Sequence, residues 1–203
     1  MIRFDKNLLS KEQHFYLGFS GGVDSLAAAV FLKRGGYNFT LLHIEHFDTE
    51  HSARIAEGVR VAAKEIGIGL LVIPVKSSLE PNEANAHKIR SEVFSSQDCK
   101  VVLCNHLNDM GESYFMNMCR GHPERVPIYA VNSNIIRPFL ATRKKDFEDF
   151  GKNNSLEHLI VPDYMKNERY RLRTEVFPVI GQDFTKVCYK LFISSGRIYD
   201  TLI

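Results

Sequence analysis

The segment from His14 to Ser25 reads HFYLGFSGGVDS, so an apolar run meets two glycines and then a helical pattern. Gly21 and Gly22 allow the sharp turn and the close backbone approach that such a junction requires. A helix that begins near Val23 aims its unpaired N–H groups and its positive dipole end at this turn. The segment therefore predicts a buried strand, an anion-binding turn suited to a phosphate, and a helix, in that order.

The predicted turn also carries side chains that suit a phosphate and its metal ion. Ser20 and Ser25 supply hydroxyl groups, and Asp24 supplies a carboxylate able to hold a magnesium ion that bridges phosphates. We expect the anion to be bound by the loop residues Ser20, Gly21, Gly22, Val23, Asp24 and Ser25. A glycine turn that joins a strand to a helix and binds no ligand is the plainer alternative.

Three known motifs compete for these residues. A Walker A loop requires a lysine that follows its last glycine, and no lysine follows Gly21 or Gly22. Residues 18–22 match the G-x-S-x-G nucleophile elbow, but an elbow serine lies in the middle of a sheet and only one candidate strand precedes Ser20. The third motif is S-G-G-x-D-S, and on it the chain resembles the N-type ATP pyrophosphatases. That resemblance implies ATP, cleaved between its α and β phosphates, with Mg²⁺ held by Asp24.

Apolar strands and amphipathic helices alternate along the first part of the chain. The patterns predict strands at 15–19, 39–44, 70–75 and 101–104, and helices at 23–33, 50–66, 82–94 and 109–119. Because the strands are continuously apolar, we expect a parallel sheet with helices on both faces, a Rossmann-like α/β fold of the adenine nucleotide alpha hydrolase type. Ligands bind at the carboxyl ends of such strands, where the glycine loop and the segment 105–112 are both expected.

The second half of the chain changes character. A short apolar segment at 135–140 is interrupted by Pro138, a charged helix is expected at 143–152, and residues 123–133 have no assignable pattern. Apolar residues at helical spacing over 184–202 predict a helix that docks on the rest of the protein. We therefore divide the chain into an ATP-binding α/β domain at 1–140 and a helical extension at 141–203 that packs on it.

Composition excludes several classes of protein. The chain has 203 residues, 44% of them hydrophobic, and contains no apolar run long enough to span a bilayer. The first eleven residues lack the apolar core of a signal peptide, so a cytoplasmic location is expected. Four irregularly spaced cysteines do not form a disulfide framework. Cys99, Cys104 and His106 are better explained by buried structural thiols than by a metal site.

Several further blocks of sequence follow one another in the order found in one family. The chain resembles the tRNA(Ile)-lysidine synthetases from about Phe15 to Pro178 through LHIEH at 42–46, AHKIR at 86–90, HLNDMGES at 106–113, Arg120-Gly121, Arg137-Pro138 and RYRLR at 169–173. The resemblance implies a short form without the C-terminal tRNA-binding domains of longer relatives. It also implies an enzyme that adenylates an anticodon cytidine of tRNA(Ile) and then attaches L-lysine.

The resemblance implies roles for residues beyond the glycine loop. Asp109 and Glu112 share one helix face and would recognise the two ammonium groups of lysine, although first-turn acids also suit a helix dipole. Arg90 would face the nucleotide or the adenylated base, with a solvated charge as the alternative. His106 would act in the site, although a lone histidine at a strand end is commonly a hydrogen-bonded structural residue.

Arginines in the second half predict contact with RNA. Arg169, Arg171 and Arg173 alternate with Tyr170 and Leu172, which suggests a strip that contacts phosphates with an aromatic ring available for stacking. Arg137 joins this expected RNA-binding set.

Two other functions stay open. Within the same fold, a thiolase or amidating ligase is possible, and a thiolase would need catalytic cysteines, for which Cys104 and Cys119 are the candidates near the site. A module that binds nucleotide or RNA without turnover is the other alternative. It is motivated by Asn108, which stands where the resembled family usually has an aspartate, and by residues 122–131, which replace the glycine-rich segment that usually follows Arg-Gly in that family.

Overall fold

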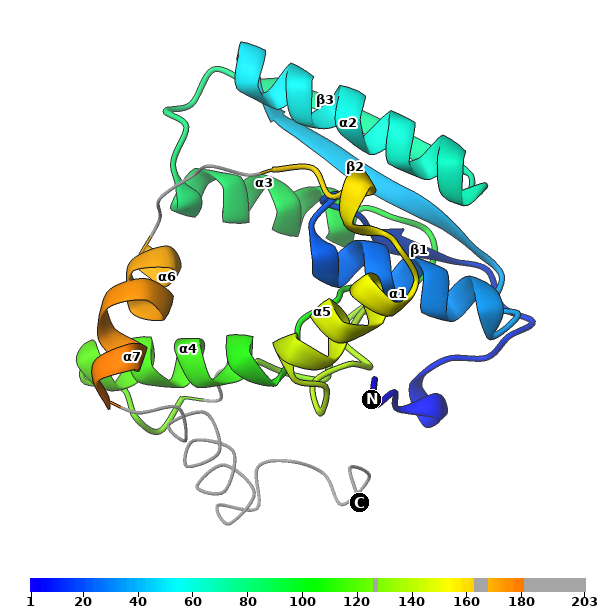
Figure 1. The fold of residues 1–203 in the computed structure, drawn as a ribbon. Helices are drawn as coiled ribbons and strands as arrows, with labels where there is room; N and C mark the ends of the chain where they lie inside the picture. The colour runs from blue at the N-terminus through cyan, green and yellow to red at the C-terminus, as the bar shows by residue number, and fades with distance from the viewer. Residues whose placement is uncertain (126–127, 163–167, 181–203) are drawn as a thin grey trace.

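The computed structural model describes residues 1–125, 128–162 and 168–180. At its centre the described residues form a six-stranded sheet in the order β3-β2-β1-β4-β6-β5 (Figure 1). The strands are β1 (Phe15–Gly18), β2 (Phe39–Phe47), β3 (Leu70–Ser77), β4 (Val101–Val102), β5 (Val131–Asn132) and β6 (Ile135–Ile136). All pairs are parallel except β5 with β6. The predicted Rossmann-like α/β fold is therefore confirmed, with one antiparallel edge strand that the sequence pattern did not predict.

Helices join and flank the strands. The α-helices of the described residues are α1 (Val23–Arg34), α2 (Glu50–Ile66), α3 (Glu83–Ser95), α4 (Leu107–Cys119), α5 (Lys144–Asn153), α6 (Glu168–Arg171) and α7 (Phe177–Ile180). Short 3-10 turns are η1 (Lys6–Leu8) and η2 (Glu157–Leu159), and a π-helical turn, η3 (Leu172–Val176), joins α6 to α7. No helix among these residues is long and apolar enough to cross a membrane.

The two faces of the sheet carry separate cores, as the continuously apolar strands predicted. Leu17 and Leu41 contribute to a core with α1, α2 and α5, whose Phe147 is fully buried. Leu42 of β2 and Tyr16 of β1 belong to the opposite core, which α3 covers through Ala86 and Ile89. Successive strand residues point to opposite faces, so a parallel sheet of this kind needs apolar residues at nearly every position.

Two differences from the sequence pattern have identifiable reasons. The apolar segment at 135–140 forms a strand only at Ile135–Ile136, ahead of Pro138, which lacks a backbone N–H for the ladder. The helix expected from Asp109 begins two residues earlier, at Leu107, because His106 caps it. The helix predicted at 184–202 lies outside the described residues.

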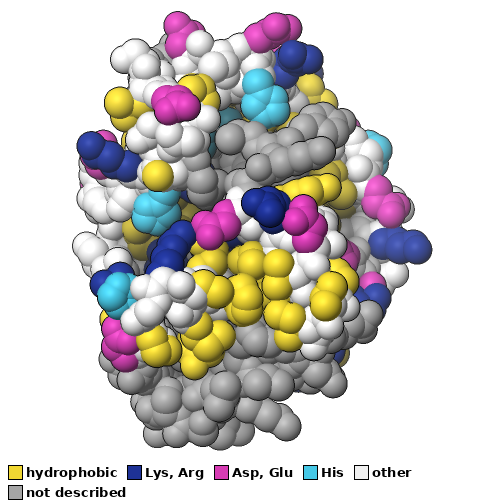
Figure 2. Space-filling model, turned by 90° about the vertical axis from the view of Figure 1, so that its left-hand side faces the viewer, with side chains coloured by type: hydrophobic (Ala, Val, Ile, Leu, Met, Phe, Trp, Pro, Cys, Tyr) yellow, Lys and Arg dark blue, Asp and Glu magenta, His cyan; other side chains and the backbone are white. Residues whose placement is uncertain are grey.

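The last described segment returns to α4. In Figure 1, α6 and α7 lie beside α4, although about fifty residues of chain separate them. Figure 2 shows hydrophobic side chains gathered on this side of the molecule, where Val179 and Ile180 of α7 are exposed. Phe115 and Phe177 meet edge to face between α4 and α7, with ring centroids 5.8 Å apart. The segment therefore packs against α4 through an aromatic contact.

Candidate active site

The order of the strands reverses between β1 and β4. The chain proceeds from β1 through β2 to β3 on one side, and β4 pairs with the other side of β1. Ligands of open α/β sheets bind at such a point, outside the carboxyl ends of the strands. Two segments leave the sheet there: the phosphate loop, which we define as residues 20–25 after β1, and residues 103–106, which lead from β4 into α4.

The phosphate loop is held by its own hydroxyl groups. Ser25 Oγ accepts a hydrogen bond from the Ser20 amide at 3.3 Å and donates one to the Gly22 carbonyl at 3.1 Å. Gly21 has φ of 78°, a conformation that glycine adopts at little cost. A Cβ built on Gly22 would meet only Ser20 Oγ, at 3.4 Å. The backbone of the loop is therefore open on the side of Gly22, as close approach of an anion requires.

Asp24 suits a divalent cation. Its side chain is 29% exposed, and its Oδ1 is buried without a hydrogen-bond partner among the described residues. Burial works against ionisation of this carboxyl, but His106, Lys144 and Arg173 outweigh it and lower the pKa of Asp24. An ionised carboxylate with one uncommitted oxygen at the start of α1 is the donor that Mg²⁺ prefers, so the residues present fit this ion.

His106 connects the phosphate loop to α4. Its Nε2 lies 3.5 Å from Asp24 Oδ2, and its Nδ1 accepts the Asp109 amide at 3.3 Å. Asp109 Oδ2 accepts the His106 amide in return at 3.0 Å, so the two residues form a reciprocal capping box. Burial favours the neutral imidazole, but Asp24 and Asp109 outweigh it and raise the pKa of His106. This buried imidazole therefore fixes the start of α4 relative to Asp24.

Asp109 and Glu112 lie on one face of α4, as predicted, and both accept hydrogen bonds from arginines. Glu112 is 1% exposed and accepts Arg173 Nη2 at 2.9 Å and Arg169 Nη1 at 3.3 Å. Asp109 Oδ1 accepts Arg173 Nη2 at 3.3 Å. Burial favours the neutral form of Arg173, but Glu112 outweighs it and raises the pKa of Arg173. The guanidinium groups thus contact the two acids for which the family resemblance implied recognition of lysine.

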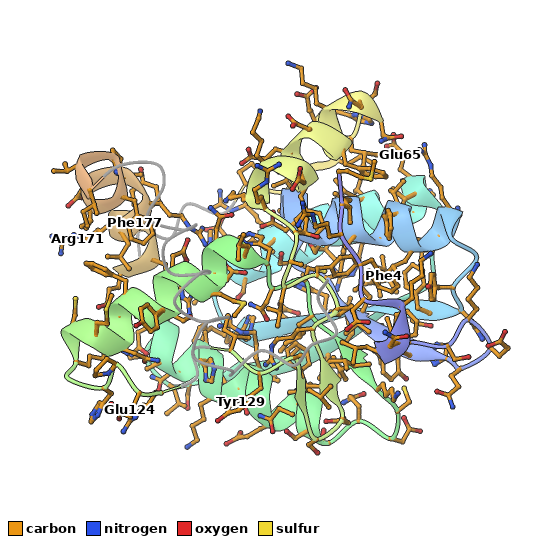
Figure 3. The ribbon with its side chains drawn as sticks, turned by 90° about the horizontal axis from the view of Figure 1, so that it is seen from below. Phe4, Glu65, Glu124, Tyr129, Arg171 and Phe177 are labelled. Carbon is orange, nitrogen blue, oxygen red and sulfur yellow. The ribbon has the colours of Figure 1, made fainter. Side chains whose placement is uncertain are left out.

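The expected arginine strip does not lie on one face. Because the segment is helical, Arg169 and Arg173 are four residues apart on the side that faces α4. Arg171 points away, is 72% exposed and pairs with Glu175 at 3.4 Å (Figure 3). Alternation would place all three together only on an extended strand. Arg171 is therefore the member of the strip that faces solvent.

Arg137 and Arg90 take other places. Arg137 Nε donates to Asn105 Oδ1 at 3.0 Å and its Nη1 to the carbonyl of Tyr129 at 2.9 Å. Asn105 Nδ2 in turn donates to Asp109 at 3.4 Å, so Arg137 supports the acid pair through Asn105. Arg90 is half-buried on α3. Asn105 was not among the predicted site residues, and its only sequence signal is its place directly before His106.

The cysteines do not assemble a metal site within the described part of the chain. No group of three metal-ligating side chains occurs there. Burial raises the pKa of the Cys104 thiol, and the nearby carboxylates of Asp24 and Asp109 raise this pKa further. Cys119 is exposed at the end of α4. His106, the third member of the trio considered from the sequence, contacts Asp24 and Asp109.

Comparison with known families agrees with the geometry of the loop. The PP-loop domain family matches residues 2–180, which is most of the chain. The chain belongs to the PP-loop family. The resemblance to the ATP pyrophosphatases is therefore confirmed at the level of the family.

Curated relatives are tRNA(Ile)-lysidine synthases. The protein from Caldanaerobacter subterraneus subsp. tengcongensis is 27% identical over 88% of this chain and 42% of its own length. The protein from Chlamydia abortus is 26% identical over 92% of this chain and 66% of its own length. The PP-loop chain described here therefore spans about two fifths to two thirds of the length of these relatives.

Solved structures agree on the fold. A U34-tRNA thiolase from Methanococcus maripaludis, solved with its [4Fe-4S] cluster, matches 96% of this chain and 75% of its own, with a TM-score of 0.72 and 16% identity. The NMN synthetase from Francisella tularensis matches 97% of this chain and 82% of its own, with a TM-score of 0.56 and 14% identity. At these identities the likeness concerns the architecture of the PP-loop domain alone.

Proposed function

We propose that this PP-loop protein is an ATP-dependent ligase that modifies RNA and attaches lysine to a cytidine of tRNA(Ile). The observation that carries the proposal is the line of contacts from Asp24 through His106 to Asp109, which Arg173 continues to Glu112. It joins a phosphate-binding element to a pair of carboxylates at one edge of the sheet. The names of the curated relatives support the same reaction.

In the proposed reaction, the cytidine O2 attacks the α phosphate of ATP, and pyrophosphate leaves. The lysine amine then displaces AMP from the adenylated base. Mg²⁺ bound at Asp24 would neutralise charge on the phosphates. The amide of Gly22, which donates to Ser20 Oγ at 3.3 Å in this structure, and the Ser20 hydroxyl would donate hydrogen bonds to the departing pyrophosphate.

The acid pair retains hydrogen-bond acceptor capacity for an ammonium group. A carboxylate has about four acceptor positions. Glu112 receives three donors, all from Arg169 and Arg173, and Asp109 receives donors from Asn105, the His106 amide and Arg173. Each carboxylate is thus left with about one acceptor position. We infer that a lysine ammonium binds at these positions, beside the guanidinium groups of Arg169 and Arg173.

A labelling experiment tests the proposal. Incubation of the protein with Mg²⁺, ATP, labelled lysine and bulk tRNA should place label in the RNA and release AMP and pyrophosphate. Omission of ATP is the control. Release of ADP as the main product would contradict the proposal, and nucleotide binding without any product would favour the inactive module.

Cysteine substitutions separate the ligase from a thiolase. We expect Cys104→Ala and Cys119→Ala to retain ligase activity within about threefold, because an amine nucleophile requires no thiol. The thiol of Cys104 also has a raised pKa, which disfavours the reactive thiolate. The measurement is lysine incorporation by each variant. Loss of activity in either variant with an intact fold would favour the thiolase.

The arrangement of the arginines predicts which one contacts RNA. Arg171→Ala should weaken tRNA binding and lower the slope of log affinity against log salt by about one, as loss of one phosphate contact would. Lys145→Ala, an exposed cation on α5 that pairs with Asp149, is a matched control. Filter binding at several salt concentrations measures the effect. An unchanged slope in Arg171→Ala would remove this residue from the RNA interface.

A further inference from the structure

A residue late in the chain holds the phosphate loop from outside. The Val161 amide donates to the Gly21 carbonyl at 3.0 Å. A trans peptide points its carbonyl and its following N–H in opposite directions. Fixing the Gly21 carbonyl on Val161 therefore turns the Gly22 N–H to the other side, where it donates to Ser20 Oγ at 3.3 Å. A Cβ added to Gly22 would meet only the same Ser20 Oγ, at 3.4 Å, so the loop is open beside this hydroxyl.

The Val161 side chain fits a notch made by two glycines. A Cβ added to Gly21 would lie 2.7 Å from Val161 Cγ2, and one added to Gly58 of α2 would lie 2.9 Å from the same atom. At distances below 3.0 Å, either the added Cβ or the Val161 side chain would have to move. Val161 is branched and packs on the core, so it cannot move freely. The absence of a side chain at Gly58 is thus what lets Val161 reach the loop.

The segment that leads to Val161 is anchored to the main core, to α2 and to α5. Leu159 in η2 is 6% exposed within the main core. His158 Nε2 lies 2.6 Å from Glu65 Oε1 on α2, and the Leu156 amide donates to the Gly151 carbonyl at 2.9 Å. These contacts fix the position from which Val161 reaches Gly21.

We propose that Val161 and Gly58 are positioning residues for the phosphate loop. They act through the Gly21 peptide. Gly58 leaves space for the Val161 side chain, and the hydrogen bond from the Val161 amide to the Gly21 carbonyl then orients the Gly22 N–H toward the phosphate. Neither residue is placed to touch the nucleotide itself. The inference rests on the proposed binding of ATP at this loop.

Gly58→Ala tests the inference without altering the loop itself. The added methyl group displaces Val161, so the dissociation constant of the Mg²⁺ complex of α,β-methylene-ATP should rise about tenfold. The double variant Gly58→Ala/Val161→Ala removes the clash and keeps the amide, so its dissociation constant should return to within about threefold of the wild type. Gly69→Ala is the matched control, since its added Cβ would find its nearest neighbour at 3.9 Å. Isothermal titration calorimetry well below the melting temperature provides the measurement.

Several outcomes would overturn the inference. An unchanged nucleotide affinity in folded Gly58→Ala would do so, as would a double variant no better than the single one. A purely structural role would lower the affinities for nucleotide and tRNA together, whereas positioning of the loop should leave tRNA affinity unchanged. If Gly58→Ala does not fold, the double variant still tests the inference. With the clash removed, it is expected to fold and to bind the analogue, and failure to do so would overturn the inference. Failure of the wild-type protein to bind the analogue would instead contradict the proposed function.

Discussion

Replacing Asp24 with asparagine is expected to lower ATP-dependent pyrophosphate release about 100-fold or more while the fold survives. The amide keeps the shape of the side chain and still accepts a hydrogen bond from His106 Nε2, which lies 3.5 Å from Asp24 Oδ2. It cannot supply the charge that Mg²⁺ requires. Pyrophosphate release over a range of Mg²⁺ concentrations, with a thermal melt, measures the effect.

A control separates the metal site from the helix dipole. Glu50 is also an acid in the first turn of a helix, is 85% exposed and pairs with Arg54. Glu50→Gln should cost a few tenths of a kcal/mol of stability at most and leave activity unchanged. Normal pyrophosphate release in Asp24→Asn would mean that Asp24 is merely a favourable residue at the start of α1.

The second large effect is expected at Glu112. Glu112→Gln should raise the KM for lysine about 30-fold or more, since truncating a charge that pairs with a buried ion costs roughly 2 to 5 kcal/mol. The Glu112 side chain is 1% exposed and accepts hydrogen bonds from Arg169 and Arg173, so the substitution also leaves these guanidinium groups short of a partner. Steady-state kinetics with lysine varied measures the change.

Two comparisons show whether Glu112 recognises lysine or only anchors arginines. Glu175→Gln removes an exposed partner of Arg171 and should leave both stability and KM nearly unchanged. A Glu112→Gln protein with a lowered melting temperature but a normal KM for lysine would assign Glu112 to the anchoring of α6 and η3 alone. The lysine ligase proposal would then lose its amine site.

Asn108 has a structural explanation. Its Oδ1 accepts the Lys144 amide at 2.9 Å and so satisfies an N–H group in the first turn of α5. An amide oxygen performs this role as a carboxylate would, and the acids that receive Arg173 are Asp109 and Glu112. The departure at Asn108 therefore removes no group from the acid pair, which weakens the reason for an inactive module.

The sequence by itself determined the elements and the phosphate loop, because those depend on contacts within a few residues. Apolar periodicity predicted α2 at Glu50–Ile66 with the observed bounds, and two glycines between a strand and a helix predicted the turn that precedes α1. Strand ends meet at one edge of any parallel sheet, so the approach of His106 to the loop followed from the fold class.

Only the tertiary structure decided which charges meet and what holds the loop. The alternation of Arg169, Arg171 and Arg173 suggested that all three lie on one face of an extended segment. The segment is instead helical in α6 and η3, with a rotation of about 100° per residue. Arg171 therefore faces solvent, whereas the other two contact Glu112. The contact of Val161 with Gly21 joins positions 140 residues apart and leaves no local pattern. Such contacts depend on how packed elements bring distant backbone together, which no short stretch of sequence encodes.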